Sequence, residues 1–224
     1  MEVIAYIESD FPEKFGVPRQ SGMVNSLVSK IVFVPEYRDD SSLRGLEGFE
    51  YIWLIWDFSL SHKEGWSPTV RPPRLGGNKR MGVFATRSPN RPNPIGLSSV
   101  KLLKIEKTEK EGSVIYVSGA DLANGTPIYD IKPYLPMSDS HPGARAGFAK
   151  DYEDYRLTVD IPYDIAKGFP KEKLTSLIEV LSLDPRPSYH SDAEREYGFS
   201  FSGYNIKFKV CEETLCVTEI TPCE

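Results

Sequence analysis

The chain has 224 residues, of which 27 are lysine or arginine and 32 are aspartate or glutamate, giving a formal net charge of -5. Its 40% hydrophobic and 26% charged residues are ordinary for a globular protein, which excludes wholesale disorder and a fibrous class. This length fits one large domain or a main domain with a small appendage, and we favour the second organisation.

The first 145 or so residues are typical of strands joined by turn-rich loops. β-Branched and aromatic residues predict strands at residues 3–7, 29–34, 49–58, 81–85, 96–105 and 113–120. Several short strands without long helices between them indicate an antiparallel sheet that closes into a barrel or sandwich, rather than a parallel doubly wound sheet. We therefore predict a mainly β fold, with an antiparallel barrel-like N-terminal domain over residues 1–150.

Residues 151–224 are predicted to form a small α+β C-terminal subdomain. Leucine and isoleucine recur with the spacing of an amphipathic helix over residues 171–183, which Asp184-Pro185 should end. Alternating residues predict strands at 204–210 and 215–220, with Glu212-Glu213 in the turn between them. Since few residues remain for a core of its own, this subdomain should pack on the first domain.

The sequence offers little that indicates membranes, disulfides or metals. The longest apolar run, residues 51–56, is far shorter than the roughly 20 residues of a membrane span. The N-terminus lacks the features of a secretory signal, so we expect a cytoplasmic protein without a membrane partner. The cysteines lack C-x-x-C spacing and are interpreted as unpaired thiols.

Histidine chemistry is also disfavoured. His62, His141 and His190 are not in metal-ligand spacing, so we expect no bound metal. Catalysis by histidine needs a positioned partner, which the sequence does not reveal. All three are therefore interpreted as solvated or hydrogen-bonded loop residues.

Positive charge is concentrated in one segment, because no acidic residue lies between Glu64 and Glu106. The cations of this segment are Arg71, Arg74, Lys79, Arg80, Arg87, Arg91, Lys101 and Lys104. An acidic protein with one cationic segment attracts an anion to one place, and this pattern favours a nucleic-acid partner. The alternative is that these charges scatter over a solvated face in the folded chain.

Two loops within this segment are candidate binding elements. Residues 87–96 contain three prolines in six positions, which stiffen the backbone and hold the guanidinium groups of Arg87 and Arg91 for carboxylate or phosphate recognition. The alternative is a barrel corner whose arginines bond backbone carbonyls. Residues 71–80 combine cations with Gly76-Gly77, a composition that suits either a mobile nucleic-acid-binding loop or a long surface connection.

A third candidate lies in residues 121–134, where Asn124-Gly125 is a strong turn signal. If the chain is extended after this turn, Asp130, Lys132 and Tyr134 point to one face. A carboxylate, an ammonium and a phenol together form a plausible acid/base and anchoring set, although a surface Asp-Lys pair explains two of the three equally well. No G-x-G-x-x-G or Walker loop is present. The residues alone thus indicate a β-rich, anion-binding protein with enzymatic activity left open.

Several motifs resemble the TsaA-like family, which includes the tRNA methyltransferase TrmO. They are residues 14–20 (KFGVPRQ), 44–49 (RGLEGF), 66–78 (WSPTVRPPRLGGN), 81–88 (MGVFATRS), 91–96 (RPNPIG), 121–136 and 184–187 (DPRP). The resemblance extends over nearly the whole chain, and the motifs occur in the same order as in the family.

The resemblance implies a β-barrel that binds S-adenosylmethionine without a Rossmann fold, and a homodimer with its active site between subunits. It also implies methylation of the threonylcarbamoyl-adenosine beside the anticodon of tRNA. By matching motifs, the cofactor contacts are expected at Arg19, Gln20, Ser59, Leu60, Arg87, Arg91, Leu97, Asp121, Leu122 and Asn124. The sequence departs from the family at Asn124, where an aspartate is frequent, and at Ser59, where histidine is frequent.

Residue roles follow from this resemblance and from the chemistry of the donor. A sulfonium methyl group is already activated, so the protein must align the acceptor nitrogen and handle one proton. Asp130, tuned by Lys132 and Tyr134, is expected near that nitrogen. The tRNA contacts are expected at Arg71, Arg74, Lys79 and Arg80. Two other hypotheses remain: a non-enzymatic module that binds tRNA or another anion, and a methyltransferase of the same fold with another substrate.

Overall fold

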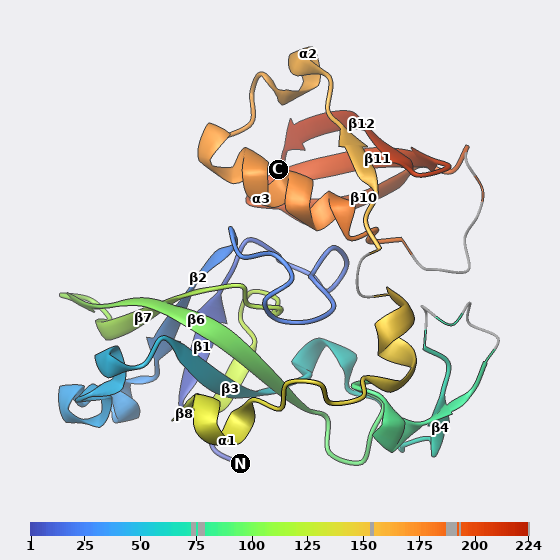
Figure 1. The fold of residues 1–224 in the computed structure, drawn as a ribbon. Helices are drawn as coiled ribbons and strands as arrows, with labels where there is room; N and C mark the ends of the chain where they lie inside the picture. The colour runs from blue at the N-terminus through green and yellow to red at the C-terminus, as the bar shows by residue number, and fades with distance from the viewer. Residues whose placement is uncertain (73–74, 76–78, 153–154, 187–191, 193, 224) are drawn as a thin grey trace.

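A computed structural model describes residues 1–72, 75, 79–152, 155–186, 192 and 194–223. It contains a barrel in the first two thirds of the chain and a smaller α+β domain above it (Figure 1). The barrel strands are β1 (Ala5–Glu8), β2 (Val28–Phe33), β3 (Tyr51–Asp57), β6 (Ile95–Thr108), β7 (Gly112–Ser118) and β8 (Pro127–Pro133). They close in the order β1-β2-β7-β6-β3-β8, and all their pairings are antiparallel. The predicted mainly β fold with a barrel-like first domain is confirmed.

Strand alternation separates an inner from an outer surface of this barrel. In β3, Ile52, Leu54 and Trp56 are buried in the core that the inward side chains of all six strands form. The residues between them face outward, because successive side chains of a strand point to opposite faces. This alternation is important for the site, since it decides which side chains can meet inside the barrel mouth and which lie on its outer wall.

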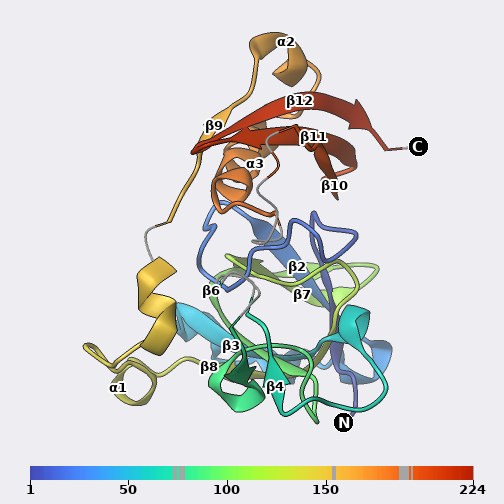
Figure 2. The same ribbon diagram turned by 90° about the vertical axis from the view of Figure 1, so that its right-hand side faces the viewer.

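Short elements decorate the barrel. The 3₁₀ turns are η1 (Pro35–Tyr37), η2 (Asp40–Leu43), η3 (Leu46–Gly48), η4 (Ser59–Ser61), η6 (Val83–Ala85) and η7 (Gly147–Tyr152). A hairpin of β4 (Thr69–Val70) and β5 (Met81–Gly82) projects from the barrel beside the loop that leads into β6 (Figure 2). The strand predicted at residues 81–85 is therefore wrong beyond Gly82, where Val83 buries its side chain at the start of a 3₁₀ turn.

The C-terminal domain packs the helix α3 (Lys171–Ser182) on a four-stranded sheet. The sheet order is β10 (Tyr197–Phe201), β11 (Tyr204–Cys211), β12 (Thr214–Pro222) and β9 (Thr158–Asp160). The helix and the last two strands match the prediction, whereas β9 and β10 were missed. β9 has three residues and pairs in parallel with β12, so it leaves almost no local pattern. Cys211, Cys216 and Cys223 are free thiols, as predicted.

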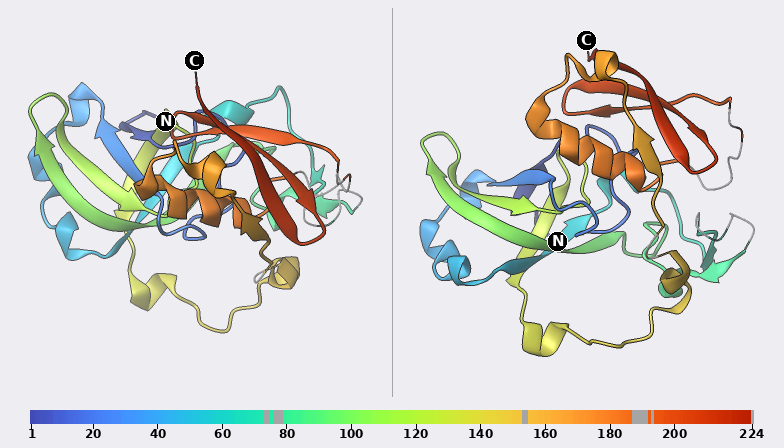
Figure 3. Two further views of the ribbon diagram at one scale, coloured as in Figure 1. Left: turned by 90° about the horizontal axis from the view of Figure 1, so that it is seen from above. Right: turned by 45° about the horizontal axis from the view of Figure 1, so that its top comes forward.

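A long connection links the two domains. It carries α1 (Pro136–Asp139) and η7 along the outside of the barrel before the chain enters β9 and α2 (Tyr163–Ala166) (Figure 3). Among the described residues, no helix is long and apolar enough to cross a membrane.

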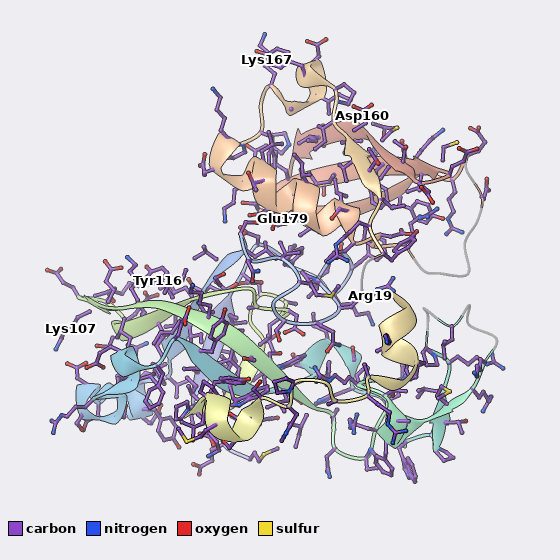
Figure 4. The ribbon with its side chains drawn as sticks, in the orientation of Figure 1. Arg19, Lys107, Tyr116, Asp160, Lys167 and Glu179 are labelled. Atoms are coloured by element: carbon purple, nitrogen blue, oxygen red, sulfur yellow. The ribbon has the colours of Figure 1, made fainter. Side chains whose placement is uncertain are left out.

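The N-terminal segment before β2 packs into the C-terminal domain. Phe11, Val24 and Leu27 belong to the same buried cluster as the apolar face of α3 and the sheet. Lys173 on α3 forms an ion pair with Asp10, with Nζ and Oδ2 2.6 Å apart. Figure 4 shows Glu179 on the side of α3 that faces the barrel, where it accepts a hydrogen bond from the Ser26 hydroxyl. The expected packing of the small domain on the first domain is thus present.

Gly16 lies at the tightest point of this junction. Its φ is +90°, and a Cβ there would lie 2.4 Å from the ring of Phe199. Gly16→Ala should therefore lower the free energy of unfolding by roughly 2–5 kcal/mol, from backbone strain and overpacking together. Gly22→Ala is a matched control, because Gly22 has a φ of +75° and nothing within 4 Å of the added Cβ. Urea unfolding measures both variants. Equal losses would contradict the close contact between Gly16 and Phe199.

Candidate functional site

Arg87 and Gln20 meet at the barrel mouth although they are far apart in the sequence. The Arg87 guanidinium donates a hydrogen bond of 2.5 Å to Oε1 of Gln20. Gln20 in turn donates from Nε2 to the backbone carbonyl of Arg19. The proline-rich loop that precedes β6 is therefore joined to the N-terminal loop through side chains that the sequence predicted as cofactor contacts.

Asp121 lies at the end of a hydrogen-bond relay that begins inside the barrel. The indole Nε1 of Trp56 donates to the Ser98 hydroxyl at 2.9 Å, and this hydroxyl donates to Oδ1 of Asp121 at 2.5 Å. Gly96 makes the relay possible, because a Cβ at this position would lie 2.1 Å from the Trp56 ring. The carboxylate of Asp121 is therefore held in one orientation by the barrel core.

Asp121 has the most perturbed acidity at this mouth. Burial raises its pKa from 3.8 to about 6, although the hydrogen bond from Ser98 and the positive charge of Arg87 oppose this rise. The negative charge of the ionised carboxylate is thus only partly balanced by the surrounding protein groups. A cation bound beside it would stabilise the charged form, which makes Asp121 suited to a positively charged ligand.

The raised pKa makes stability depend on pH. Because the folded state binds the proton more tightly than the unfolded state, the contribution of Asp121 is fully present below pH 3.8 and is lost as pH rises through about 6. Relative to the parent chain, Asp121→Asn should gain roughly 2–3 kcal/mol in unfolding free energy between pH 4 and pH 8.

A control with the opposite sign is available at Asp139. Its pKa is lowered, mainly by the backbone N–H of Leu135 and then by the indole of Trp53. Asp139→Asn should therefore lose stability relative to the parent chain as pH rises above the ordinary range of an aspartate. Urea unfolding at several pH values measures both differences. A pH-independent difference for Asp121→Asn would contradict the raised pKa.

The turn that follows Asp121 is fastened to the N-terminal segment. The Ser9 hydroxyl donates to the carbonyl of Leu122, and the Ser9 backbone N–H donates to Oδ1 of Asn124 at 3.1 Å. Leu122 is only 1% exposed, so any ligand contact from this residue must come from its backbone. Asn124 already uses its amide oxygen within the protein.

Arg19 and Arg91 both bond backbone carbonyls. Arg19 donates to the carbonyls of Asp184 and Arg186 at 3.3 and 3.0 Å, and Figure 4 shows it between the barrel and the C-terminal domain. Arg91 donates to the carbonyls of Thr86 and Ser88. Arg91 thus matches the alternative prediction, a barrel corner whose arginines bond backbone carbonyls. Arg87 instead directs its guanidinium to a side chain, that of Gln20.

A second group of predicted residues lies on the outer wall of the barrel. Leu97, Ile55 and Asp130 form one row across β6, β3 and β8 in the strand register. Since adjacent strands lie about 4.8 Å apart, Leu97 and Asp130 are roughly 10 Å from each other along this row. Leu97 is 51% exposed, so this wall is open to a partner or ligand.

Lys132 and Tyr134 lie on the same outer wall as Asp130, as the alternation predicted. Nζ of Lys132 lies 2.9 Å from Oδ2 of Asp130, and both side chains are about half exposed, which is the surface ion pair that the sequence left as an alternative. The Tyr134 ring lies 5.6 Å from the Trp53 ring, centroid to centroid. Among the described residues, no hydrogen bond or ion pair joins this wall to the Gln20, Arg87 and Asp121 group.

One cluster beside this wall was not predicted from the sequence. Nε2 of His62 lies 2.8 Å from Oδ1 of Asp57, a largely buried carboxylate that also has a hydrogen bond with the Tyr129 hydroxyl. His62 thus has the positioned partner that the sequence did not reveal. The expected cofactor corner Ser59-Leu60 lies in the η4 turn between the two partners of this contact. In the sequence, the only signal for this contact was that Asp57 ends a strand and His62 follows shortly after it.

The cationic segment is less uniform than its sequence indicated. Lys101 and Lys104 form ion pairs with Glu50 and Glu106, at 3.1 and 2.5 Å, so their charges are compensated. Arg71, Lys79, Arg80, Arg87 and Arg91 have no ion pair among the described residues. Arg74 and His190 lie outside the described residues. The described part of the chain also has no cluster of three or more side chains that could hold a metal.

The closed antiparallel barrel, with a buried carboxylate near Arg87 at its mouth, places the chain in the class of closed β-barrel proteins rather than Rossmann-type proteins. Comparison with protein families narrows this class. Residues 6–140 match the model of the tRNA-methyltransferase O N-terminal domain, and residues 162–223 match that of the TrmO C-terminal domain. The chain belongs to the TrmO family.

Individual relatives agree with this membership over the whole chain. The chain is 39% identical to the tRNA (adenine(37)-N6)-methyltransferase of Escherichia coli K12, covering 99% of this chain and 97% of the relative. It is 37% identical to a putative S-adenosylmethionine-dependent methyltransferase of Pseudomonas aeruginosa, covering 87% and 85%. A crystal structure of TrmO from P. aeruginosa superposes with a TM-score of 0.78 at 28% identity, covering 99% of this chain and 97% of that one.

Proposed function

We propose that this chain transfers the methyl group of S-adenosylmethionine to N6 of a threonylcarbamoyl-adenosine at position 37 of tRNA. Family membership supports a tRNA methyltransferase, and the printed activity of the E. coli relative supports N6 of adenosine 37 as the acceptor. The threonylcarbamoyl group rests on the family resemblance. The structural observation that carries the proposal is the Asp121 carboxylate at the barrel mouth, held beside Arg87 with a pKa of about 6.

The residues at the mouth fit this cofactor. S-Adenosylmethionine carries a sulfonium and an ammonium, and a carboxylate that lacks a full counter-charge, as Asp121 does, favours such a cation. Gln20 and Arg87 offer polar groups beside it, and backbone groups of residues 121–124 line the same turn. Ser59, Leu60, Arg91 and Leu97 remain proposed contacts. When bound, the cofactor supplies an activated methyl group.

The protein's task is then to orient the acceptor and to remove one proton. We assign the proton to Asp130, whose carboxylate pairs with Lys132, with Tyr134 as an anchor for the base. Arg71, Arg74, Lys79 and Arg80 bind the tRNA backbone, because lysine and arginine side chains bind phosphates without sequence preference. Positioning of the acceptor nitrogen provides most of the rate in this account.

A homodimer is part of the proposal. Asp121 lies at the barrel mouth, whereas Asp130 lies on the outer wall, and no described polar contact joins the two groups. Leu97 and Tyr51 leave apolar surface exposed on this wall. If a second copy packed on this wall, the barrel mouth of one copy would lie next to the outer wall of the other. Each active site would then use residues of both copies. Sedimentation of the full chain tests this arrangement, and a monomer with full activity would contradict it.

Titration calorimetry of the full chain with S-adenosylmethionine tests the proposal directly. Binding is expected at all pH values above about 6 and should weaken below it as Asp121 becomes protonated. The competing hypothesis of a non-enzymatic RNA-binding module predicts no cofactor binding. If the cofactor binds but purified tRNA with threonylcarbamoyl-adenosine accepts no methyl group, a different substrate is indicated.

A further inference from the structure

Two exposed aromatic rings lie side by side next to the proline-rich loop. Trp66 and Phe84 are 53% and 73% exposed, and their ring planes are inclined by 27° with centroids 6.3 Å apart. They belong to segments on the two sides of the β4–β5 hairpin, which the hydrogen bond from Val83 N–H to the Pro68 carbonyl holds together at 2.9 Å. We call Trp66 and Phe84 the aromatic platform.

Keeping these rings in water is unfavourable, since an aromatic side chain gains free energy when it is buried. Neither ring belongs to one of the two buried hydrophobic clusters. The platform therefore contributes little to the folding of the described residues. Both rings are therefore available to contact a ligand or a partner molecule.

One cation lies over the aromatic platform, and another lies on the same hairpin. The guanidinium carbon of Arg91 lies 6.0 Å from the centroid of Phe84. Arg80 lies on the hairpin itself, where it donates to the Thr69 hydroxyl at 2.8 Å, and it has no ion pair among the described residues. Exposed aromatic rings near cations without an acidic partner are the combination by which proteins bind unpaired nucleotides, with the rings stacking on bases and the cations holding phosphates.

We propose that the aromatic platform stacks on an unpaired base of the anticodon loop of the tRNA. This inference rests on the proposed function, because it takes tRNA as the substrate. Arg91 connects the platform to the candidate active site, since it lies over Phe84 and also bonds the backbone of the loop that carries Arg87. Stacking there would hold a loop nucleotide beside the one that is methylated. A purely apolar protein partner is disfavoured because a guanidinium, that of Arg91, lies over one of the two rings.

The test uses the full chain and a synthetic anticodon stem-loop RNA with threonylcarbamoyl-adenosine and a fluorescent label. Fluorescence anisotropy at fixed salt measures the dissociation constant. Trp66→Leu and Phe84→Leu should each weaken binding by about tenfold, the effect typical of losing one stacked base. Trp66→Phe and Phe84→Tyr keep a ring and should bind nearly as the parent chain does. Tyr163→Leu is the matched control, because Tyr163 is 80% exposed on α2, away from the platform.

An abasic substitution in the RNA identifies the stacked base. Replacing each unpaired loop nucleotide other than the threonylcarbamoyl-adenosine in turn by an abasic one should weaken binding to the parent chain at one position, and the same replacement should have no further effect on Phe84→Leu. Cofactor affinity, measured by calorimetry, should be unchanged in Phe84→Leu. These results together would establish the platform as a base-stacking site.

Three outcomes would overturn the inference. If the parent chain binds and methylates the RNA but the leucine variants bind equally well, the platform is not a base-stacking site, while the proposed function stands. If the leucine variants change the sedimentation of the chain without changing RNA affinity, the rings belong to a contact between copies. If the parent chain binds no stem-loop RNA at all, both the platform and the proposed substrate are wrong.

Discussion

Asp130→Asn is expected to lower the turnover of methyl transfer by about 10²- to 10⁴-fold at saturating cofactor, the usual effect of removing a general base. The amide keeps the shape of the side chain but cannot accept the proton of N6. Asp130 is half exposed and makes a surface ion pair, so the substitution should change the stability of the fold by less than about 1 kcal/mol. Single-turnover methylation of tRNA with radiolabelled cofactor measures the effect.

Glu219→Gln is the matched control, because Glu219 forms a similar half-exposed ion pair with Lys207 in the C-terminal domain. It should leave turnover unchanged. Near-normal turnover of Asp130→Asn would show that the assigned proton role is wrong. In that case His62 would be the next candidate, since its imidazole is oriented by Asp57 beside the same wall.

Arg87→Ala is expected to weaken cofactor binding by roughly 10- to 150-fold, which corresponds to the loss of one charge-assisted hydrogen bond. The substitution removes the bond that positions Gln20, together with a guanidinium suited to the carboxylate of the cofactor. tRNA affinity should change by less than about threefold, because Arg87 is assigned to the cofactor and not to the tRNA phosphates. Calorimetry with cofactor and anisotropy with tRNA separate the two effects.

Arg80→Ala should show the converse behaviour. Arg80 lies on the hairpin, bonds the Thr69 hydroxyl, and has no contact with the barrel mouth among the described residues. Its loss should weaken tRNA binding at every sequence and reduce the salt dependence, with cofactor affinity unchanged. If both variants weakened both ligands equally, the division of the cationic segment into a cofactor part and an RNA part would be contradicted.

The sequence predicted these barrel strands well because β-branched and aromatic content is a local property. β3, β6 and β7 each have seven or more residues, and the structure has them within two or three residues of the expected bounds. β9 could not be predicted, because three residues that pair in parallel with β12 depend on a partner more than fifty residues away. The joining of the N-terminal segment to the core of the C-terminal domain is equally non-local.

The candidate site was predictable where side chains meet along one strand and unpredictable where they meet across the fold. The common face of Asp130 and Lys132 followed from alternation. The compensation of Lys101 by Glu50 required the register between β3 and β6. The contact of His62 with Asp57 depended on the shape of one turn. Charge counted along a sequence therefore overstates the cations available to a ligand.

The central claim is methylation of threonylcarbamoyl-adenosine in tRNA, and a complementation experiment tests it most directly. An Escherichia coli strain that lacks its own tRNA (adenine(37)-N6)-methyltransferase would express this chain, and mass spectrometry would then analyse the nucleosides of total tRNA. Methylated threonylcarbamoyl-adenosine should be restored by the parent chain and not by Asp130→Asn. Well-expressed, folded parent chain that leaves the nucleoside unmethylated would contradict it.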